Sequence, residues 1–366
     1  MKRIAFFKYD ITIVGGSERV GVNLINELLN EMKNVRFYIF SLKKKNKFPA
    51  YEINNKVEII YVNKDDLRLR FCFIKVFYEL IKIIKKEKID IIINVGMATA
   101  VYSCFFKLFI NIKIISCEHS NILNKINNNY IQKINQKIAS LFSDKIVTLT
   151  KKDMDGYIKK YNIKKEKIDY IHNFIDDDLS NLKYEYNIQS KKIITVGRFD
   201  KVKGYDRLVR IARDVLEKNK EWEWDIYGDG EEFENIKKLI KINNLEKKLI
   251  LKGNSNKIYE IYKEYSFYVM TSYYEGLPMV LLEAKANSLP IVSFDCYTGP
   301  SEIIRNDVDG YLIKNDDINE MIEKINLLIY DSEKRQKFSK NSRGNINKFK
   351  KEKIIKKWKE LFEEIK

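Results

Sequence analysis

Two glutamates lie eight residues apart in "YYEGLPMVLLEAKANSLPIVSF", and the chain between them is apolar. Glu275 comes shortly before Pro278, and proline suits the first turn of a helix because its missing N–H would have no partner there anyway. We therefore expect a helix from Met279 to about Asn287. Glu275 would stand on the loop before this helix, and Glu283 would lie about one and a half turns inside it.

A helix that begins at this point offers a binding site for a sugar phosphate. Its N-terminus carries partial positive charge and free N–H groups, which can receive a phosphate. Glu275 would be near enough to touch a sugar hydroxyl, and Glu283 is better placed to accept hydrogen bonds from ribose hydroxyls. The alternative interpretation is structural, in which Glu283 pairs with a lysine and Glu275 caps the helix.

Two cations share a loop in "VGRFDKVKGYDRL" (196–208). The pattern predicts a strand that ends at Gly197 and a helix that begins near Tyr205, with Arg198 and Lys203 on the loop that joins them. Such a loop beside a helix N-terminus is a natural diphosphate site, in which arginine clamps oxygens bidentately and lysine adds a point charge. The alternative is that both are ordinary solvated cations in a chain with 68 lysines and arginines.

A glycine pair and a histidine follow two predicted strands of the first half. In "IVGGSERVGVNLINELL", Gly15 and Gly16 lie between a strand and a helix, where glycine lets the backbone approach a ligand closely. The pattern is not G-x-G-x-x-G, so the dinucleotide fingerprint is absent. In "CEHSN", His119 stands at the carboxyl end of a strand, and it is either a site residue or a structural histidine.

Short apolar runs alternate with helical patterns along the whole chain, which indicates parallel sheets with crossover helices. We expect strands at 3–9, 35–42, 57–62, 89–95, 112–117 and 145–149, and again at 191–197, 223–228, 248–253, 267–272 and 290–294. The predicted fold class is α/β, with two Rossmann-like, doubly wound parallel-sheet domains facing a central cleft. Ligands bind beyond the carboxyl ends of strands in such sheets, where every candidate residue above is expected.

The polar, acidic stretch 173–190 is typical of a linker. We expect an N-terminal domain over 1–183, a C-terminal domain over 184–349 and a final helix over 350–366. Apolar residues recur every three or four positions in that helix and predict that it packs back on the body of the protein. They are Ile354, Trp358, Leu361 and Ile365.

The composition argues against several classes of function. Four scattered cysteines without a C-x-x-C pair, and only two histidines, favour neither a metal site nor a disulfide framework, so we expect no metal and no cofactor. No run of 18 uncharged apolar residues suggests a membrane span. The N-terminus lacks the apolar core of a signal peptide, so we expect a cytoplasmic protein.

The charge is uneven, because the first 183 residues hold 33 Lys and Arg against 20 Asp and Glu, out of a net +17. An anionic partner would explain this, as would an AT-rich coding bias. The segment 67–88 favours an anionic membrane surface, since its cations share one face of a helix rich in bulky apolar residues, and 105–113 has a similar character. These cations are Arg68, Lys75, Lys82 and Lys86. The alternative is a crossover helix with a solvated lysine face.

The motifs "GGSERV", "EHSN", "HNFID", "GRFDKVKG", "YGDG", "EGLPMVLLE" and "TGPSEII" together resemble glycosyltransferase family 4. They cover essentially the whole chain and keep the order of that family, whose members have the GT-B fold and are retaining, metal-independent enzymes. The most specific part is the Glu-x7-Glu pattern that encloses "GLP", together with the Arg and Lys of "GRFDKVKG".

The resemblance implies a role for each candidate residue. Arg198 and Lys203 would hold the donor diphosphate and stabilise it as it leaves. Glu275 would contact the donor sugar, Glu283 the ribose, and His119 matches a histidine near the donor sugar. Further donor-binding positions are implied at Gly15, Gly16, Gly228, Gly253, Asn254, Gly276 and Leu277.

The implied enzyme transfers a hexose or N-acetylhexosamine from a UDP-sugar to a glycan acceptor in bacterial surface polysaccharide or glycoconjugate synthesis. The motifs lean towards an acceptor linked to a polyprenyl diphosphate, which would place the protein peripherally on the inner face of the cell membrane. One alternative is a nucleotide-sugar epimerase of the same fold, which needs no acceptor. The other is a basic nucleic-acid-binding protein, which would require basic patches with interleaved aromatic residues; we expect no nucleic-acid partner.

Overall fold

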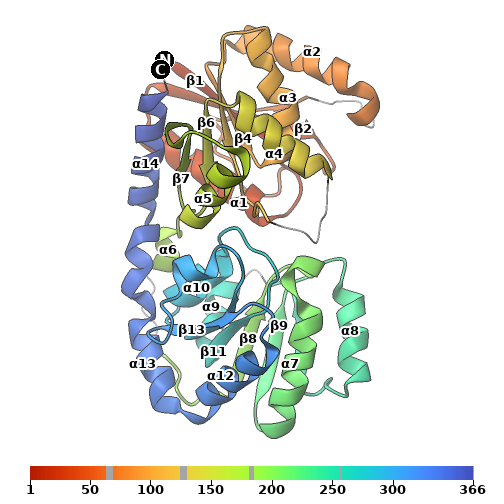
Figure 1. The fold of residues 1–366 in the computed structure, drawn as a ribbon, viewed down its shortest axis with the longest axis vertical. Coiled ribbons are helices and arrows are strands. Elements are labelled where there is room, and N and C mark those ends of the chain that lie inside the picture. Colours follow the sequence, from red (N-terminus) through yellow and green to blue (C-terminus); the bar gives the residue numbers. More distant parts are fainter. Residues whose placement is uncertain (63–68, 124–129, 181–184, 256, 366) are drawn as a thin grey trace. The chain divides into compact units, whose positions relative to one another are not determined.

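The computed structural model describes residues 1–62, 69–123, 130–180, 185–255 and 257–365. The chain divides into two compact units. The first consists of Met1–Asn173 together with Ile354–Lys366, and the second of Phe174–Lys353. Each unit is built around one parallel sheet with helices packed against it (Figure 1).

The sheet of the first unit has seven strands in the order β3-β2-β1-β4-β5-β6-β7, and every pair is parallel. The strands are β1 (Lys2–Asp10), β2 (Val35–Lys43), β3 (Glu58–Tyr61), β4 (Ile91–Val95), β5 (Lys113–Cys117), β6 (Lys145–Thr148) and β7 (Ile168–Tyr170). β4 is buried at all five residues. A central strand covered on both faces must be apolar throughout, which explains why its sequence does not alternate.

The helices of the first unit are α1 (Gly16–Glu31), α2 (Leu69–Glu87), α3 (Ala100–Ser103), α4 (Tyr130–Phe142), α5 (Lys151–Tyr161) and α14 (Lys351–Glu364), with 3₁₀ turns at Met97–Thr99 (η1), Cys104–Leu108 (η2) and Lys165–Lys167 (η3). The first three residues of α14 belong to the second unit. α1 buries Val22, Ile25 and Leu28 at helical spacing. Thr150 caps the N-terminus of α5: its hydroxyl accepts a hydrogen bond from the Asp153 N–H at 3.1 Å and satisfies a free donor of the first turn.

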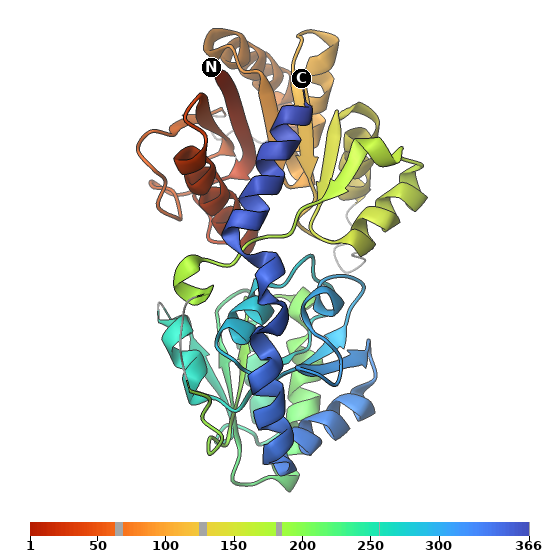
Figure 2. The same ribbon diagram turned by 90° about the vertical axis from the view of Figure 1, so that its left-hand side faces the viewer.

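The last helix, α14, lies along the first sheet (Figure 2). Its buried apolar face consists of Ile354, Ile355, Trp358, Leu361 and Phe362. The Lys2 ammonium donates to the Phe362 carbonyl at 2.6 Å, and Lys359 pairs with Glu31 of α1 at 3.2 Å. The chain therefore ends in the unit in which it began.

The sheet of the second unit has six strands in the order β10-β9-β8-β11-β12-β13, again all parallel. The strands are β8 (Lys192–Val196), β9 (Glu223–Tyr227), β10 (Leu249–Gly253), β11 (Phe267–Met270), β12 (Ile291–Asp295) and β13 (Gly310–Lys314). Both sheets have the doubly wound topology that the sequence predicted. The strand order reverses beside β8, so the carboxyl ends of β8 and β11 form the topological switch point, where ligands bind in such sheets.

The helices of the second unit are α6 (Asp177–Ser180), α7 (Tyr205–Lys218), α8 (Phe233–Ile242), α9 (Ile258–Ile261), α10 (Met279–Ala286), α11 (Pro300–Ile303), α12 (Ile318–Tyr330) and α13 (Ser332–Ser342), with 3₁₀ turns at Lys201–Lys203 (η4), Tyr262–Glu264 (η5) and Arg343–Phe349 (η6). One core cluster joins α7, α8 and α12 to the sheet, with Trp224, Leu208 and Ile325 fully buried. This core fixes the start of α7, which carries part of the site described below.

The expected strands are confirmed to within one or two residues, but two strands were missed. β7 has only three residues at the edge of its sheet, and β13 lies in a run rich in charged residues, so neither has a distinct apolar pattern. The expected linker 173–190 contains the short helix α6. Within the described ranges, no helix is long and apolar enough to cross a membrane.

Candidate active site

The loop after β8 makes a tight turn that presents Lys203. Asp200 begins the 3₁₀ turn η4, and its Oδ1 accepts a hydrogen bond from the Val202 N–H at 3.0 Å. Gly204 then joins this turn to α7 with φ +64°, and a Cβ at this position would lie 2.2 Å from the Thr271 carbonyl oxygen. The "DKVKG" sequence thus supplies a cap, a cation and a residue small enough for the close approach to β11.

The loop after β11 carries Glu275, and it is fixed from two sides. The Ser272 hydroxyl donates to the Glu275 carboxylate at 2.6 Å, and the Thr298 hydroxyl donates to the Glu275 carbonyl at 2.6 Å. Pro278 precedes the first residue of α10, Met279, as predicted. Glu275 therefore has a defined position just before the N-terminus of α10.

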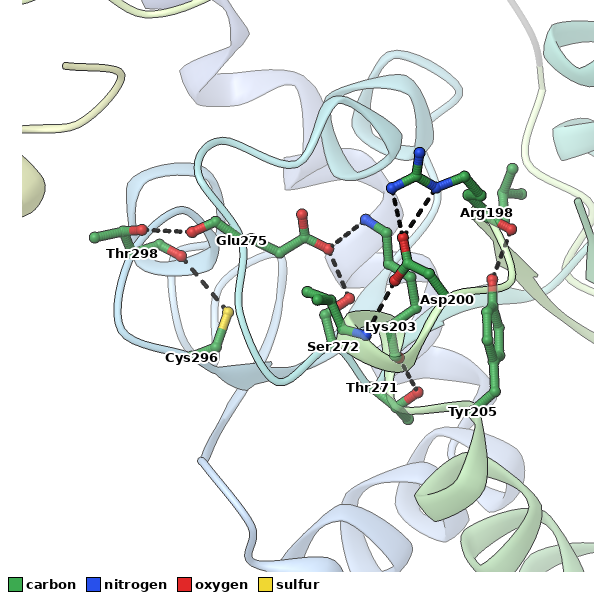
Figure 3. Close-up of polar contacts among 12 residues, drawn as sticks. Arg198, Asp200, Lys203, Tyr205, Thr271, Ser272, Glu275, Cys296 and Thr298 are labelled. Atoms are coloured by element: carbon green, nitrogen blue, oxygen red, sulfur yellow. Dashed lines mark hydrogen bonds and ion pairs between the residues drawn. The ribbon is translucent and has the colours of Figure 1, made fainter. Parts of the chain in front are cut away.

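An ion pair joins these two loops (Figure 3). The Lys203 Nζ lies 2.7 Å from the Glu275 Oε1, and the two side chains are only 24% and 10% exposed. Burial by itself would lower the pKa of Lys203, but Glu275, with Asp200 in addition, holds this pKa above its ordinary value. The ammonium is therefore charged at neutral pH. The pair lies at the switch point of the sheet, where a cation can meet a phosphate.

Arg198 lies on the same loop as Lys203 and has a different partner. Its Nε and Nη2 donate to the Asp200 Oδ2 at 2.9 and 2.8 Å, and its side chain is 66% exposed. The guanidinium thus lies at the surface of the loop, bound to Asp200 and accessible to an anion. An anion would compete with Asp200 for Arg198, and the charge of Asp200 also acts on Lys203.

Glu283 lies deeper, in the second turn of α10, and is only 3% exposed. The Tyr262 hydroxyl donates to its Oε2 at 3.3 Å. Burial raises the pKa of Tyr262 and the negative charge of Glu283 raises it further, so the tyrosine keeps its proton and remains a donor. Tyr262 is thus one partner of the Glu283 carboxylate.

The loop after β9 packs against the Arg198 loop through a glycine and is hydrogen-bonded to the end of β10. Gly228 has φ +140°, and a Cβ there would lie 2.0 Å from the Gly197 carbonyl oxygen. The Gly228 N–H donates to the Gly253 carbonyl at 2.9 Å, and Gly253 has φ +70°. Asn254 follows as an exposed residue. These predicted donor-binding positions therefore share one edge of the sheet with Arg198.

Gly276 and Leu277 lie between Glu275 and α10. Leu277 is buried, whereas Gly276 is partly exposed. Gly299, with φ +98°, packs closely against this segment, since a Cβ on it would lie 2.9 Å from the Gly276 carbonyl oxygen. The loop after β12 thus supports the turn that leads into α10.

In the first unit, Gly15 and Gly16 form the start of α1. The Gly15 N–H donates to the Tyr51 hydroxyl at 3.2 Å, and a Cβ on Gly16 would meet nothing within 4 Å. Next to them is a buried ion pair that the sequence analysis missed, in which Lys8 of β1 lies 2.8 Å from Glu18. A lysine facing the core at the end of an apolar strand, and the glutamate of "GGSERV", are the signals that could have revealed it.

His119 follows β5 at the carboxyl edge of the first sheet. Burial and the charge of Lys8 lower its pKa to about 3, so the imidazole is neutral. Its neighbour Glu118 is almost fully buried and accepts hydrogen bonds from Gln136 at 2.9 Å and Tyr157 at 2.5 Å. Glu118, which no sequence pattern singled out, anchors the loop that carries His119.

The structure thus gathers the candidate residues at two sheet edges, one in each unit. Neighbouring strands of the second sheet carry, at or just after their carboxyl ends, Arg198, Lys203, Gly228, Gly253 and Glu275. Among the residues that the structure describes, no group of three or more histidines, cysteines, aspartates or glutamates is placed to hold a metal ion. The cations of this edge are the side chains of lysine and arginine.

Comparison with protein families assigns both halves of the chain. Residues 14–179 match the family described as Glycosyltransferase Family 4, and residues 179–345 match the family described as Glycosyl transferases group 1. An uncharacterized glycosyltransferase of Haemophilus influenzae is 31% identical over 98% of this chain and 99% of its own length. The amylovoran biosynthesis glycosyltransferase AmsD of Erwinia amylovora is 30% identical over 95% of each chain.

The name of a more distant relative states both its transferred sugar and its acceptor. An N-acetylgalactosamine-N,N'-diacetylbacillosaminyl-diphospho-undecaprenol 4-alpha-N-acetylgalactosaminyltransferase of Campylobacter jejuni is 24% identical over 97% of each chain. Among solved structures, a variant of S. aureus TarM in complex with fondaparinux, alpha-GlcNAc-glycerol and UDP superposes with a TM-score of 0.83. It is 18% identical and covers 99% of this chain and 100% of its own, so it shows the fold alone.

Proposed function

This chain belongs to the glycosyltransferases of family 4 and group 1, and from that premise we propose that it moves a hexose or N-acetylhexosamine from a UDP-sugar to a glycan acceptor. The fold is GT-B, and the relatives place the enzyme in bacterial glycan synthesis. The UDP-sugar donor, the retained configuration, the independence of metal, the lipid-linked acceptor and the membrane association are proposals.

The observation that carries the proposal is the Lys203–Glu275 ion pair at the switch point of the second sheet, with Arg198 on the same loop. Breaking a glycosyl–phosphate bond places negative charge on the departing diphosphate. Fixed cations stabilise this charge more strongly in the transition state than in the ground state, which lowers the barrier. Lys203 and Arg198 supply these cations, and Glu275 lies beside them to accept a hydrogen bond from a donor-sugar hydroxyl.

The proposed nucleotide is UDP. The loops of Gly228 and Gly253 give the nucleoside a backbone surface beside the cations, and Glu283 offers a carboxylate for the ribose. The TarM structure named above contains UDP, which supports the same choice here. His119 is neutral, and we assign it the place that the family resemblance implies, near the donor sugar.

We further propose that transfer retains the anomeric configuration and needs no metal cofactor. Two side-chain cations can neutralise the diphosphate, which is the task of a divalent ion in other transferases. The departing diphosphate oxygen can itself take the proton of the acceptor hydroxyl when attack occurs on its own face of the sugar. In this scheme the protein holds and stabilises the diphosphate, and it forms no covalent intermediate.

The proposed acceptor is a glycan on a polyprenyl diphosphate, by analogy with the Campylobacter relative, whose name includes diphospho-undecaprenol. A surface of the first unit supports membrane association. Ile74 and Tyr78 of α2 and Leu108 and Phe109 at the end of η2 are all exposed, and the Phe77 and Phe109 rings lie 5.5 Å apart, so the two segments adjoin. Lys75 and Lys82 of α2 are exposed too. Arg68 lies outside the described residues.

Flotation with liposomes of anionic or neutral lipid at low salt tests the membrane proposal. The protein should float with anionic vesicles, and exchange of Lys75 and Lys82 for glutamate should weaken this binding. Recovery of all protein in the soluble fraction at low salt would refute the membrane proposal without affecting the transferase assignment.

A screen of nucleotide sugars tests the transfer reaction. We expect a UDP-sugar to protect the protein against thermal unfolding and to be consumed faster when a glycan acceptor is added, with an unchanged anomeric configuration in the product and no loss of rate in EDTA. Release of an epimerised sugar without any acceptor would instead favour the epimerase.

A further inference from the structure

A buried arginine lies directly beneath the proposed donor site. Arg207 is in the first turn of α7, only 5% exposed, and it donates from Nε to the Thr271 carbonyl and from Nη2 to the Ser272 carbonyl, each at 2.6 Å. Its guanidinium carbon lies 4.0 Å from the ring centroids of both Tyr273 and Phe294. This side chain is thus fixed by hydrogen bonds and by contact with aromatic rings.

The two carbonyls that Arg207 holds belong to residues that make the donor site. Thr271 donates through its hydroxyl to the Lys203 carbonyl at 3.2 Å, and Ser272 donates through its hydroxyl to the Glu275 carboxylate at 2.6 Å. One side chain of α7 therefore holds the start of the loop after β11. Thr271 and Ser272 of this loop contact both partners of the Lys203–Glu275 pair (Figure 3).

We propose that Arg207 is a positioning residue that sets the geometry of the Lys203–Glu275 pair by fixing the backbone of Thr271 and Ser272. Arg207 lies in the helix that follows the loop after β8, and it donates to two carbonyls of the loop after β11, so it couples these two segments. The inference rests on the proposed function for its catalytic meaning, but the coupling itself is a property of the folded chain.

The chemistry of the site requires an arginine. Two successive backbone carbonyls point at one side chain, and only a planar guanidinium can donate to both while it stacks on aromatic rings. A third donor of the guanidinium, Nη1, donates to the carboxylate of Asp316, which follows β13, at 2.5 Å. A lysine at position 207 would reach one carbonyl at most, so Arg207→Lys should behave as an intermediate case.

Reactivity of the Lys203 amine provides a test that needs no substrate. Trace acetylation at pH 9, followed by peptide mass spectrometry, reports how well Glu275 holds the ammonium. Glu275→Gln should label Lys203 roughly tenfold faster than wild type, since loss of the pair removes the negative charge that holds the pKa of Lys203 above its ordinary value. Arg207→Met should approach that rate. Loss of a nearby positive charge alone would slow the labelling, so an increase reports a change of geometry.

Arg335 supplies the matched control. It is also 5% exposed, donates to the Leu328, Ile329 and Ile188 carbonyls, and lies over the Trp222 ring, but it has no bond to the site. Arg335→Met should lose comparable stability and label Lys203 at the wild-type rate. If Arg207→Met does not fold, Arg207→Lys gives the same comparison. We expect it to label Lys203 about threefold faster than wild type, which is roughly half of the tenfold effect on a logarithmic scale.

A wild-type labelling rate of Lys203 in a folded Arg207 variant would overturn the inference, and so would an equal increase in the Arg335 variant. Activity provides the second measurement. With the UDP-sugar that wild type uses, Arg207→Lys should lower kcat at least tenfold with little change in KM, whereas Arg335→Lys should not. Failure of the proposed function would be visible separately, as wild type that consumes no UDP-sugar while the labelling result stands.

Discussion

Lys203 is the residue on which the proposed chemistry depends most. Its ammonium is paired with Glu275 before any ligand binds, so the positive charge is already in place when a diphosphate arrives. A charge that is pre-positioned needs no reorganisation during the reaction, which is the reason such groups lower barriers effectively. Arg198, by contrast, must leave Asp200 or share it with the ligand.

Lys203→Ala should reduce kcat by about 10²–10³-fold, the usual effect of losing one group that stabilises charge in a transition state. Stability should change little, because the side chain lies on a loop and is partly exposed. The control is Lys201→Ala, which removes an exposed lysine from the same turn. Equal turnover in the two variants, measured with a UDP-sugar and its acceptor, would remove Lys203 from the proposed role.

Asp153 gives a prediction for pH. Burial, together with the negative charge of Glu118, raises the pKa of Asp153 to about 8, from an ordinary 3.8. Between pH 4 and 8 the folded protein therefore holds a proton that the unfolded chain releases, and the free energy of unfolding falls as the pH rises. Asp153→Asn keeps the acceptor for the Ile122 N–H and removes the titration, so its Tm should fall less between pH 5 and 8.

Differential scanning calorimetry of wild type, Asp153→Asn and the exposed control Asp155→Asn checks this prediction. Each kcal/mol corresponds to about 2–4 °C in a domain of this size. The control should follow wild type. An Asp153 variant whose Tm falls as steeply as that of wild type would show that this carboxyl is already ionised at pH 5.

At the scale of residues, the sequence indicated which side chains could bind phosphate or sugar, but it did not indicate which residues contact them. Arg198, Lys203 and Glu275 were recognisable because cations after one strand and a carboxylate before a proline-started helix suggest phosphate and sugar binding. The partner of Lys203 is 72 residues away, and its distance depends on the pairing of β8 with β11, which no local pattern contains. For the same reason Ser272 and Arg207 were missed.

At the scale of elements, the short connection from η4 to α7 determines how closely α7 can approach the loop after β11. Gly204 approaches the Thr271 carbonyl so closely that any larger residue would separate α7 from the end of β11. The sequence predicted the strand and the helix on either side, because their apolar periods are clear. It did not reveal the close approach, since glycine is common in loops for several reasons.

Gly204→Ala should destabilise the protein by on the order of 2–4 kcal/mol, since it combines positive φ with a clash against backbone. Gly253→Ala is the matched control, because Gly253 also has positive φ but a Cβ there would meet nothing within 4 Å. The control should lose only about 1–2 kcal/mol. Urea unfolding of both variants measures the difference, and equal losses would show that the contact with Thr271 yields easily.

For the whole molecule, the sequence predicted the two sheets and the packing of the last helix, but not the unit that this helix joins. Repetition of the strand–helix pattern predicted two doubly wound sheets, because each sheet needs its own set of apolar strands. The amphipathic stripe predicted that the last helix packs against the protein. Nothing in that stripe indicated which unit it joins, since an apolar face fits any apolar surface; contacts with Lys2, Glu31 and Lys145 place it in the first unit.

The net charge of the whole molecule is +17, and most of this excess lies in the first 183 residues. It favours approach to an anionic surface, and the attraction falls as salt screens it over about 10 Å at 0.1 M. The charge does not select the reaction, which depends on the few cations at the carboxyl edge of the second sheet. The surface charge therefore bears on the membrane proposal, and the charge of the candidate active site bears on the transfer reaction, and each has its own test.

A crystal structure of the protein with bound UDP is the most direct test of the central claim. The account predicts the diphosphate within hydrogen-bond distance of Lys203 Nζ and of Arg198, now turned away from Asp200, with the ribose hydroxyls at Glu283. Nucleotide bound elsewhere, with the Lys203–Glu275 pair closed and Arg198 still on Asp200, would contradict it.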